Sequence, residues 1–297
     1  MKTKINLTIL TIVCMCLLAC NKPNEAELTA PVTVHVDGFS VSQENFPDAN
    51  RAPSRVAANP AEYSAVNAIT LAFYKADGTE LYKHQQLKSD NTTFTTFGQF
   101  ECALPMGSHT MVVLAYYTNE NSVLTLTSPT EASFNVRARE TFAATQEVVI
   151  SNTNAVDISA TLDRIVSMLT VISTDGKTSD VTNVRMTFSS GDKDFNPSTG
   201  FALTNTGFAN TVSNSASVGA TSTSSTVLFL NTDEQNIDVT IETLDAGGNT
   251  LFSKTIENVP FKRNRVTKLS GAMYSNTGIS GAFQINTDWL TEENVAF

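Results

Sequence analysis

The sequence contains few of the residues from which catalytic and metal sites are usually built. It has three histidines, four cysteines and a single tryptophan among 297 residues. It contains no His-Glu-x-x-His zinc motif, no Gly-x-Ser-x-Gly nucleophile elbow and no Gly-x-x-x-x-Gly-Lys-Ser/Thr phosphate loop. His35, His84 and His109 each stand apart from any such motif, and we expect them at the surface. We therefore expect no cofactor, no metal ion and no enzymatic activity.

Positive charge is also scarce. Nineteen Lys and Arg residues stand against 29 Asp and Glu residues, which gives a formal net charge of -10 at pH 7. Binding to nucleic-acid phosphates depends on clustered Lys and Arg side chains. We therefore expect no nucleic-acid partner.

The longest apolar stretch lies at the amino terminus and is short for a membrane span. Lys2 and Lys4 precede a mostly apolar run over residues 5–18, whereas a spanning helix needs about 20 apolar residues. A charged start followed by such a run is typical of a signal peptide. The run ends in Leu17-Leu18-Ala19-Cys20, which resembles the lipobox of bacterial lipoproteins. We predict a lipoprotein signal peptide over residues 1–19 and lipid on Cys20, with an ordinary secretory signal as the alternative.

Cysteine usage excludes an intramolecular disulfide in the exported chain. Cys14 and Cys16 would leave with the signal peptide, and Cys20 would carry the lipid, so that Cys102 stands alone. Phe100, Cys102 and Leu104 alternate along one face of a predicted strand. Packing in a core is therefore favoured over thiol chemistry for Cys102.

Apolar residues alternate with polar ones along most of the chain, which predicts an all-β protein. One series of strands is expected over residues 32–39, 68–74, 81–83, 93–104, 109–117, 133–136 and 146–150. A second series is expected over residues 155–172, 181–188, 227–230, 237–244, 251–256, 265–273 and 282–286. Each series suits one antiparallel sandwich. Within the second series, residues 205–226 are nearly all Ser, Thr, Asn, Ala and Gly, which predicts a long mobile loop.

Two short stretches carry a resemblance to a known family. Leu162-Asp163-Arg164-Ile165-Val166 is similar to the start of the second domain of fimbrillins, the FimA- and Mfa-type pilus subunits of Bacteroidales. The basic stretch from Pro260 to Gly271, which includes Lys262-Arg263-Asn264-Arg265, resembles a late segment of the same proteins. The resemblance implies two tandem, transthyretin-like β-sandwich domains, here over residues 56–154 and 155–297. Residues 20–55 would hold the lipidated segment, a first strand at 32–41 that completes the first sandwich, and a cleavable loop.

The resemblance also implies a role and a route of assembly. The protein would be a structural subunit of a surface fimbria or pilus that functions in cell adhesion, exported to the outer membrane as a lipoprotein. An Arg-specific protease would cut after Arg51 or Arg55 and remove the lipid together with the first strand. A strand from another fimbrial subunit would then fill the groove. The segment 280–290, with Phe283, Ile285 and Trp289, is either that donor strand or the last strand of the second domain.

Two alternatives remain open at the level of sequence. If neither Arg51 nor Arg55 is cut, the protein would stay in the outer membrane as a lipid-anchored fimbrial anchor or accessory subunit. The second alternative is a surface lipoprotein that binds glycans for a nutrient-uptake system, against which the single tryptophan argues. A ligand on a host or bacterial surface is compatible with each of these functions.

Overall fold

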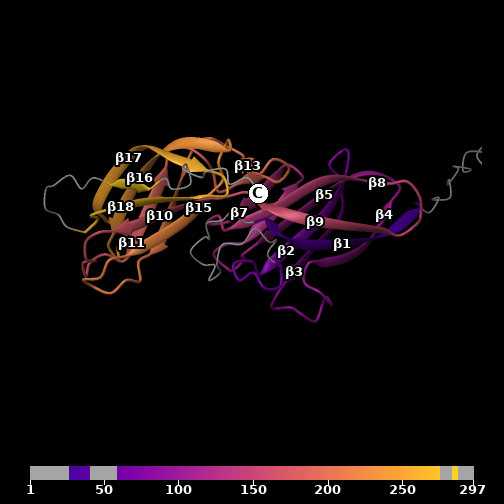
Figure 1. The fold of residues 1–297 in the computed structure, drawn as a ribbon, viewed down its shortest axis with the longest axis horizontal. Coiled ribbons are helices and arrows are strands. Elements are labelled where there is room, and N and C mark those ends of the chain that lie inside the picture. The colour runs from indigo at the N-terminus through magenta and orange to yellow at the C-terminus, as the bar shows by residue number, and fades with distance from the viewer. Residues whose placement is uncertain (1–26, 41–58, 275–282, 287–297) are drawn as a thin grey trace, which may run out of the picture.

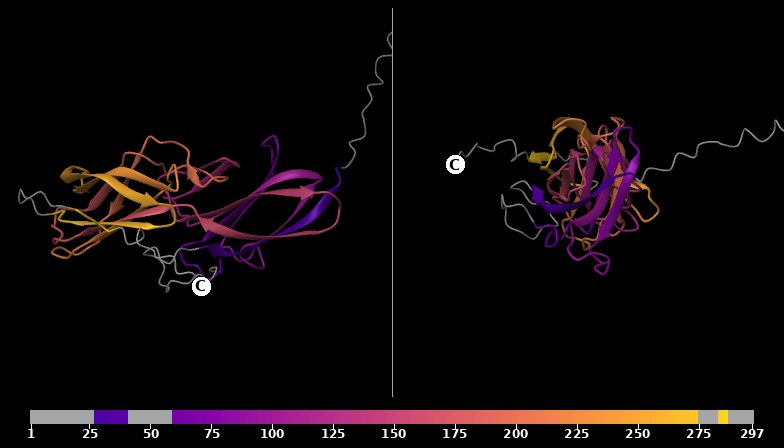
Figure 2. Two further views of the ribbon diagram at one scale, coloured as in Figure 1. Left: turned by 45° about the horizontal axis from the view of Figure 1, so that its top comes forward. Right: turned by 90° about the vertical axis from the view of Figure 1, so that its right-hand side faces the viewer.

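The computed structural model describes residues 27–40, 59–274 and 283–286. Throughout these ranges the regular elements are β-strands, and the same ranges contain no helix that is long and apolar enough to cross a bilayer. Two β-sandwich domains lie end to end along the long axis of the molecule (Figures 1 and 2). The expected all-β class is confirmed.

The first domain is built from a seven-stranded sheet in the order β3-β2-β5-β8-β9-β1-β4. β8 and β9 pair only through Phe142 with Arg164 and Ala143 with Asp163. Because this pairing is so short, the sheet folds into two layers, β3-β2-β5-β8 and β9-β1-β4, which enclose one apolar core. The strands are β1 (Thr29–Ser40), β2 (Ala68–Lys75), β3 (Glu80–Leu87), β4 (Gln99–Pro105), β5 (Gly107–Tyr116), β8 (Thr141–Ile150) and β9 (Val156–Arg164).

The second domain is a sandwich of two four-stranded sheets, β15-β10-β18-β19 and β14-β11-β16-β17. Its strands are β10 (Ser167–Ser173), β11 (Asn183–Phe188), β14 (Phe208–Ser213), β15 (Thr223–Leu228), β16 (Glu234–Leu244), β17 (Thr250–Lys262), β18 (Val266–Gly271) and β19 (Gln284–Asn286). A separate core fills the space between the two sheets.

The two domains share one topology. In each, the first strand lies between an antiparallel and a parallel neighbour: β1 between β4 and β9, and β10 between β15 and β18. The opposite layers, β3-β2-β5-β8 and β14-β11-β16-β17, also correspond in strand order. The second domain differs in carrying β19 on the outer edge of β18. The fold is therefore a structural duplication.

A small sheet joins the domains. It has the order β13-β12-β7-β6 and consists of β6 (Leu124–Ser128), β7 (Glu131–Phe134), β12 (Phe195–Asn196) and β13 (Phe201–Ala202). Beneath it lies a third apolar cluster with residues from both domains, including Tyr116, Phe134, Phe195 and Phe229. The domains are thus packed on a shared core.

The boundary between the domains differs from the expected one at residues 154 and 155. β9 pairs with β1 from Val32–Val156 to Ser40–Asp163, so it completes the first sandwich, and the second begins near Ile165. The first strand also starts earlier than expected, at Thr29. Sequence alternation detects a strand, but it does not show which domain a parallel partner belongs to.

Two further expectations were wrong. Residues 205–226 contain β14 and the start of β15, because their polar side chains are buried with hydrogen-bond partners: Asn210 Nδ2 donates to Thr226 Oγ1 at 2.5 Å, and Asn214 Nδ2 to Tyr274 Oη at 2.7 Å. His109 is 3% exposed, with its Nε2 at 2.7 Å from the Pro105 carbonyl oxygen. In both places a hydrogen bond makes the burial of a polar residue possible.

Candidate functional site

β1 is the central strand of its layer and fills a slot between two other strands. It pairs antiparallel with β4 and parallel with β9, and each pairing extends over most of its length. Five of its side chains face the core, with exposures of 7% or less: Ala30, Val32, Val34, Val36 and Phe39. Loss of β1 would therefore expose the apolar core side chains that it covers, together with the unpaired backbone edges of β4 and β9.

Phe39 is the one large side chain on the inner face of β1. The pairing of β1 with β9 shifts register between Val36 and Gly38, and this bulge keeps Phe39 on the buried face, opposite Leu162. The Phe39 ring stacks on Phe142, with centroids 4.6 Å apart and planes at 24°, and meets the edge of Tyr63 at 5.5 Å. We call the space that Phe39 fills, bounded by Tyr63, Phe142 and Leu162, the Phe39 pocket.

A buried ion pair lies directly behind this pocket. The Arg164 side chain is 1% exposed and its Nη2 lies 2.7 Å from Glu140 Oε1, whose side chain is 7% exposed. Arg164 Nη2 also donates to Tyr63 Oη at 2.8 Å, and Tyr63 Oη donates to Glu140 Oε1 at 2.7 Å. Burial, followed by the adjacent Glu140 charge, raises the pKa of Tyr63, so that it remains a phenol donor. The Arg164 guanidinium lies 5.2 Å from the centroid of Phe142.

The same arginine connects the two stretches that resemble fimbrillins. Arg164 Nη1 donates to Asn264 Oδ1 at 3.0 Å. The backbone N–H of Asn264 donates to the Val166 carbonyl oxygen at 2.8 Å. Asn264 occupies the left-handed region, with φ of 61°, in the turn between β17 and β18. The paired stretches therefore form the domain junction, and Arg164 is not a solvated charge. Sequence reasoning missed Tyr63 and Glu140, which carry no motif.

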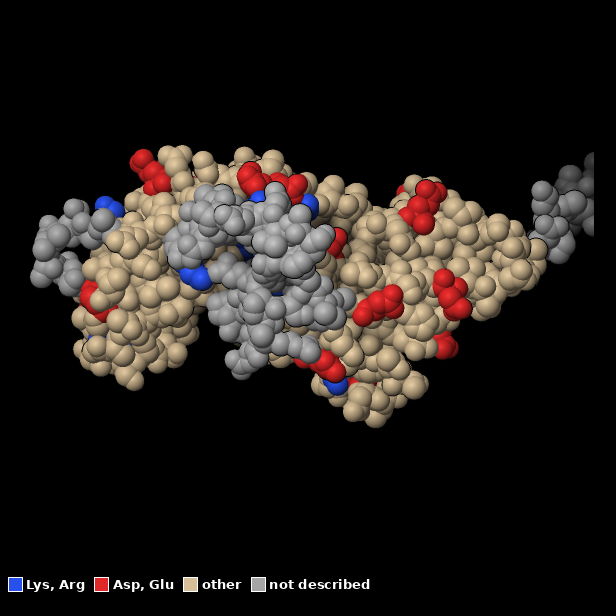
Figure 3. Space-filling model, in the orientation of Figure 1, with Lys and Arg blue, Asp and Glu red and all other residues tan. Residues whose placement is uncertain are grey.

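A polar cleft of about 640 Å³ opens beside this junction, where β8 and β9 diverge. Two of its basic side chains are paired within the chain: Arg263 Nη2 lies 2.6 Å from Asp233 Oδ1, and Lys262 Nζ lies 2.8 Å from Glu234 Oε1. No group of three or more His, Cys, Asp or Glu residues in the described ranges could hold a metal ion. On the face drawn in Figure 3, acidic side chains are spread over both domains without a basic patch.

The carboxyl-terminal strand β19 is held by a small contact surface. It pairs with β18 at only three positions, Lys268 with Asn286, Leu269 with Ile285, and Ser270 with Gln284. Phe283 packs partly against the second core, over Gly271, whereas Ile285 is 38% exposed. Of the predicted site residues, Phe283 and Ile285 thus lie on the outer edge of β18. Cys20, Arg51, Arg55 and Trp289 lie outside the described residues.

The Gly271→Ala variant is expected to displace Phe283 and release β19. A Cβ atom at position 271 would lie 2.9 Å from the Phe283 ring, closer than carbon atoms pack. Amide hydrogen exchange at residues 284–286 should increase at least about tenfold while the remaining core strands stay protected. Ser270→Ala, on the same strand but facing away from the core, is the control. Equal exchange in the two variants would show that Phe283 does not hold β19.

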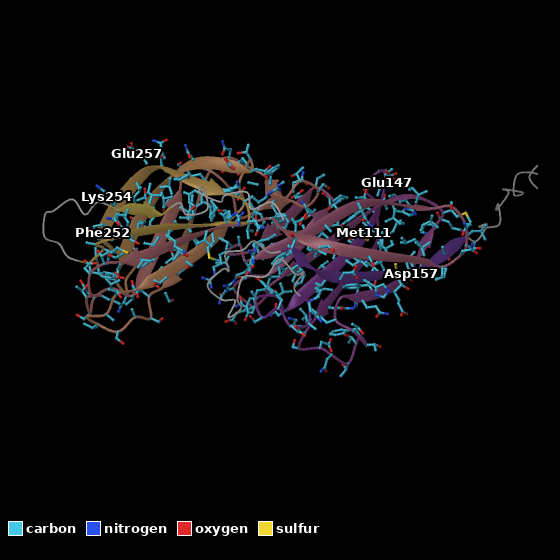
Figure 4. The ribbon with its side chains drawn as sticks, viewed as in Figure 1. Met111, Glu147, Asp157, Phe252, Lys254 and Glu257 are labelled. Carbon is cyan, nitrogen blue, oxygen red and sulfur yellow. The ribbon has the colours of Figure 1, made fainter. Side chains whose placement is uncertain are left out.

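β17 is one of the two edge strands of its sheet, and it is poorly suited to pairing with another chain. Lys254 lies opposite the buried Ile241 and so belongs to the inner face of the sheet, next to Phe252 (Figure 4). Charged side chains on an edge strand, lysine above all, discourage edge-to-edge association. The slot of β1 is therefore a better candidate for strand binding than the β17 edge.

Cys102 is expected to be chemically inert in the folded protein. It is partly buried on β4, and burial raises the pKa of its thiol from 9.0 to about 11. In a chain that begins after Cys20, an aromatic disulfide reagent at pH 8 should react about 100-fold more slowly than with the denatured chain, because the thiolate is the nucleophile. The contribution of the protonated thiol to stability is present below about pH 9 and is lost as the pH rises toward about 11. Equal rates in the folded and denatured chains would contradict this.

The model of a protein family of unknown function, DUF6562, matches residues 32–296. The chain belongs to this family. The match extends from β1 to the carboxyl-terminal segment, so both sandwich domains are part of the DUF6562 unit. A comparison with curated protein sequences finds no match.

Solved structures with a similar fold include proteins from Bacteroides ovatus and Porphyromonas gingivalis. A candidate adhesin from Bacteroides ovatus has a TM-score of 0.52 and 11% identity, covering 86% of this chain and 91% of that chain. The fimbrial anchor protein Mfa2 from Porphyromonas gingivalis has a TM-score of 0.49 and 11% identity, covering 87% of this chain and 97% of that chain. At 11% identity, the similarity to the adhesin shows that this DUF6562 member shares its fold.

Proposed function

We propose that this protein is a structural subunit of a surface fimbria or pilus that functions in cell adhesion. It is exported as a lipoprotein through Cys20, and it assembles by strand exchange after a cut at Arg51 or Arg55 removes β1. The observation that carries the proposal is the position of β1, a central strand rather than an edge strand. The similar fold of the adhesin from Bacteroides ovatus supports the class of protein.

The chain order makes a single cut sufficient. β1 ends at Ser40, the described fold resumes at Asn59, and Arg51 and Arg55 lie between these points. After a cut there, β1 is held only by non-covalent contacts with β4, β9 and the core. An empty slot is costly, because it exposes apolar side chains and two rows of backbone groups. An extended strand from another subunit removes both costs at once.

The donor strand of the proposal is the segment that contains Phe283, Ile285 and Trp289. In this chain β19 makes three residue pairs with β18, in contrast to the long ladders of β1. Releasing β19 from β18 therefore costs little free energy compared with the free energy gained by pairing along the slot of β1. The partners are other copies or other fimbrial subunits, and the cell surface is the place of assembly.

The amino terminus of protein isolated from cells tests the proposal. Cleavage predicts a start at Ala52 or Val56 together with heat-resistant polymers. The double variant Arg51→Ala/Arg55→Ala should keep an acylated Cys20 and form no polymers, whereas Arg137→Ala, at a partly exposed arginine elsewhere, should behave as the wild type. An acylated Cys20 with no shorter form in the wild type would exclude cleavage-driven assembly and indicate a lipid-anchored subunit.

A further inference from the structure

We propose that the Phe39 pocket selects the strand that occupies the slot of β1, and that it takes an aromatic side chain. In the assembled form, the occupant is the carboxyl-terminal segment of a second copy of this chain, with Trp289 in the pocket. This inference rests on the proposed function, because it assumes that β1 is exchanged for another strand.

Selectivity is concentrated at one position of the slot. Ala30, Val32, Val34 and Val36 are small or medium aliphatic side chains, and their places in the core accept many aliphatic residues. Phe39 is fully buried and contacts two aromatic rings in defined geometry, stacked on Phe142 and edge-on to Tyr63. A smaller side chain there leaves a cavity, which is costly because the surrounding aromatic rings cannot collapse into it.

The buried charges behind the pocket increase this selectivity. Phe142 lies between Phe39 and the Arg164 guanidinium, and Tyr63 contacts both the Phe39 ring and the Arg164–Glu140 pair. The close contacts of this pair depend on the exclusion of water from the site. An aromatic occupant restores the wall of rings that shields the pair, whereas a short aliphatic one leaves a gap beside it.

The spacing of the carboxyl-terminal segment matches that of β9. Along β9, the residues opposite inward-facing positions of β1 are Ile158, Ala160 and Leu162, two apart. A regular strand that runs in the direction of β1 would place Ile285 opposite Ile158 and Trp289 opposite Leu162, which is the residue opposite Phe39. This strand needs no bulge, because the extra residue in the register shift belongs to β1. In the reverse direction, Phe283 would enter the pocket instead.

Peptide binding to a cut chain tests the inference. A site-specific protease sequence is inserted after Asn50 in the chain that begins after Cys20, and the cut protein is titrated with fluorescent peptides of residues 28–42 or 282–290. Trp289→Leu in the second peptide should weaken binding at least about 30-fold, and Trp289→Phe by no more than about threefold. Ile285→Val, the control for a lost methyl group, should weaken binding by no more than about tenfold. Phe39→Leu in the first peptide should reproduce the loss seen for Trp289→Leu.

Each outcome decides a different point. If both parent peptides bind and Leu is accepted as well as the aromatic residue, the selectivity of the pocket is refuted while strand exchange stands. If Phe283→Leu weakens binding and Trp289→Leu does not, the strand runs opposite to β1 and the assignment of Trp289 is wrong. If neither parent peptide binds, the slot does not exchange its strand, and the proposed function fails with the inference. Phe142→Leu in the protein should reduce the preference for aromatic peptides, and an unchanged preference would also contradict the pocket.

Discussion

Replacing Glu140 by alanine is expected to lower the free energy of unfolding by about 3–5 kcal/mol, because it removes the carboxylate that balances a buried guanidinium. The Glu140 and Arg164 side chains are 7% and 1% exposed, and the distance from Arg164 Nη2 to Glu140 Oε1 is 2.7 Å. Tyr63 also loses the acceptor of its hydroxyl hydrogen bond. Urea denaturation followed by circular dichroism measures the change.

Glu242→Ala is the matched control for this prediction. Glu242 forms a bidentate pair with Arg185, from Nε at 2.6 Å and Nη2 at 2.7 Å, on the more exposed surface of the second domain. Such surface pairs contribute only about 0–1 kcal/mol. Hydrogen bonds from Arg185 lower the pKa of Glu242, so its contribution is present above the ordinary carboxyl pKa and is lost as the pH falls through the lowered value. Equal losses in the two variants would show that the junction pair has no special role.

The junction network shows the limit of motif reading. Arg164 and Asn264 both lie in stretches that resemble fimbrillins, so the sequence pointed to them without showing that they touch. Glu140 and Tyr63, the partners of Arg164, come from segments with no regular periodicity. A lone Glu or Tyr in such a segment looks like any surface residue. Its role depends on which distant residue the fold brings beside it, and sequence spacing does not contain that information.

The fold itself was more accessible to prediction than the site. Period-two alternation identifies half-buried strands, as in β9, where exposed and buried residues alternate from Asp157 to Arg164. The same rule fails in β14, because Asn210 is buried through its side-chain hydrogen bond to Thr226 rather than through apolar character. Composition counts such residues as loop formers. The parallel pairing of β1 with β9 was also inaccessible, since the partners are more than 100 residues apart.

A continuous series of side-chain contacts through the domain junction links β1 to the second domain. Phe39 contacts Phe142 and Tyr63, these contact Arg164, and Arg164 binds Asn264 in the turn before β18. We expect a change of the strand in the slot to alter hydrogen exchange at this turn, because the chain of contacts is continuous. The apolar cluster shared by the two domains packs at the same junction.

Phe229→Ala is expected to lower the free energy of unfolding by about 3–5 kcal/mol and to separate the unfolding of the two domains. Phe229 is fully buried in the cluster shared by the domains, stacked on Phe195 at 4.2 Å and on Phe134 of β7 at 6.5 Å. Each sandwich keeps its own core when this stack is truncated. The substitution therefore weakens mainly the packing between the domains, which couples their unfolding.

Two probes distinguish this result from a general loss of stability. Fluorescence from a label at residue 83, on β3, reports on the first domain, and a label at residue 257, an exposed position on β17, reports on the second. In Phe229→Ala the two denaturation midpoints should diverge. In Phe208→Ala, where a partly exposed ring stacked on Phe188 within the second domain is lost, they should stay together, with a smaller loss of stability. Coincident midpoints in Phe229→Ala would mean that the junction is held by the Arg164 network without help from the shared core.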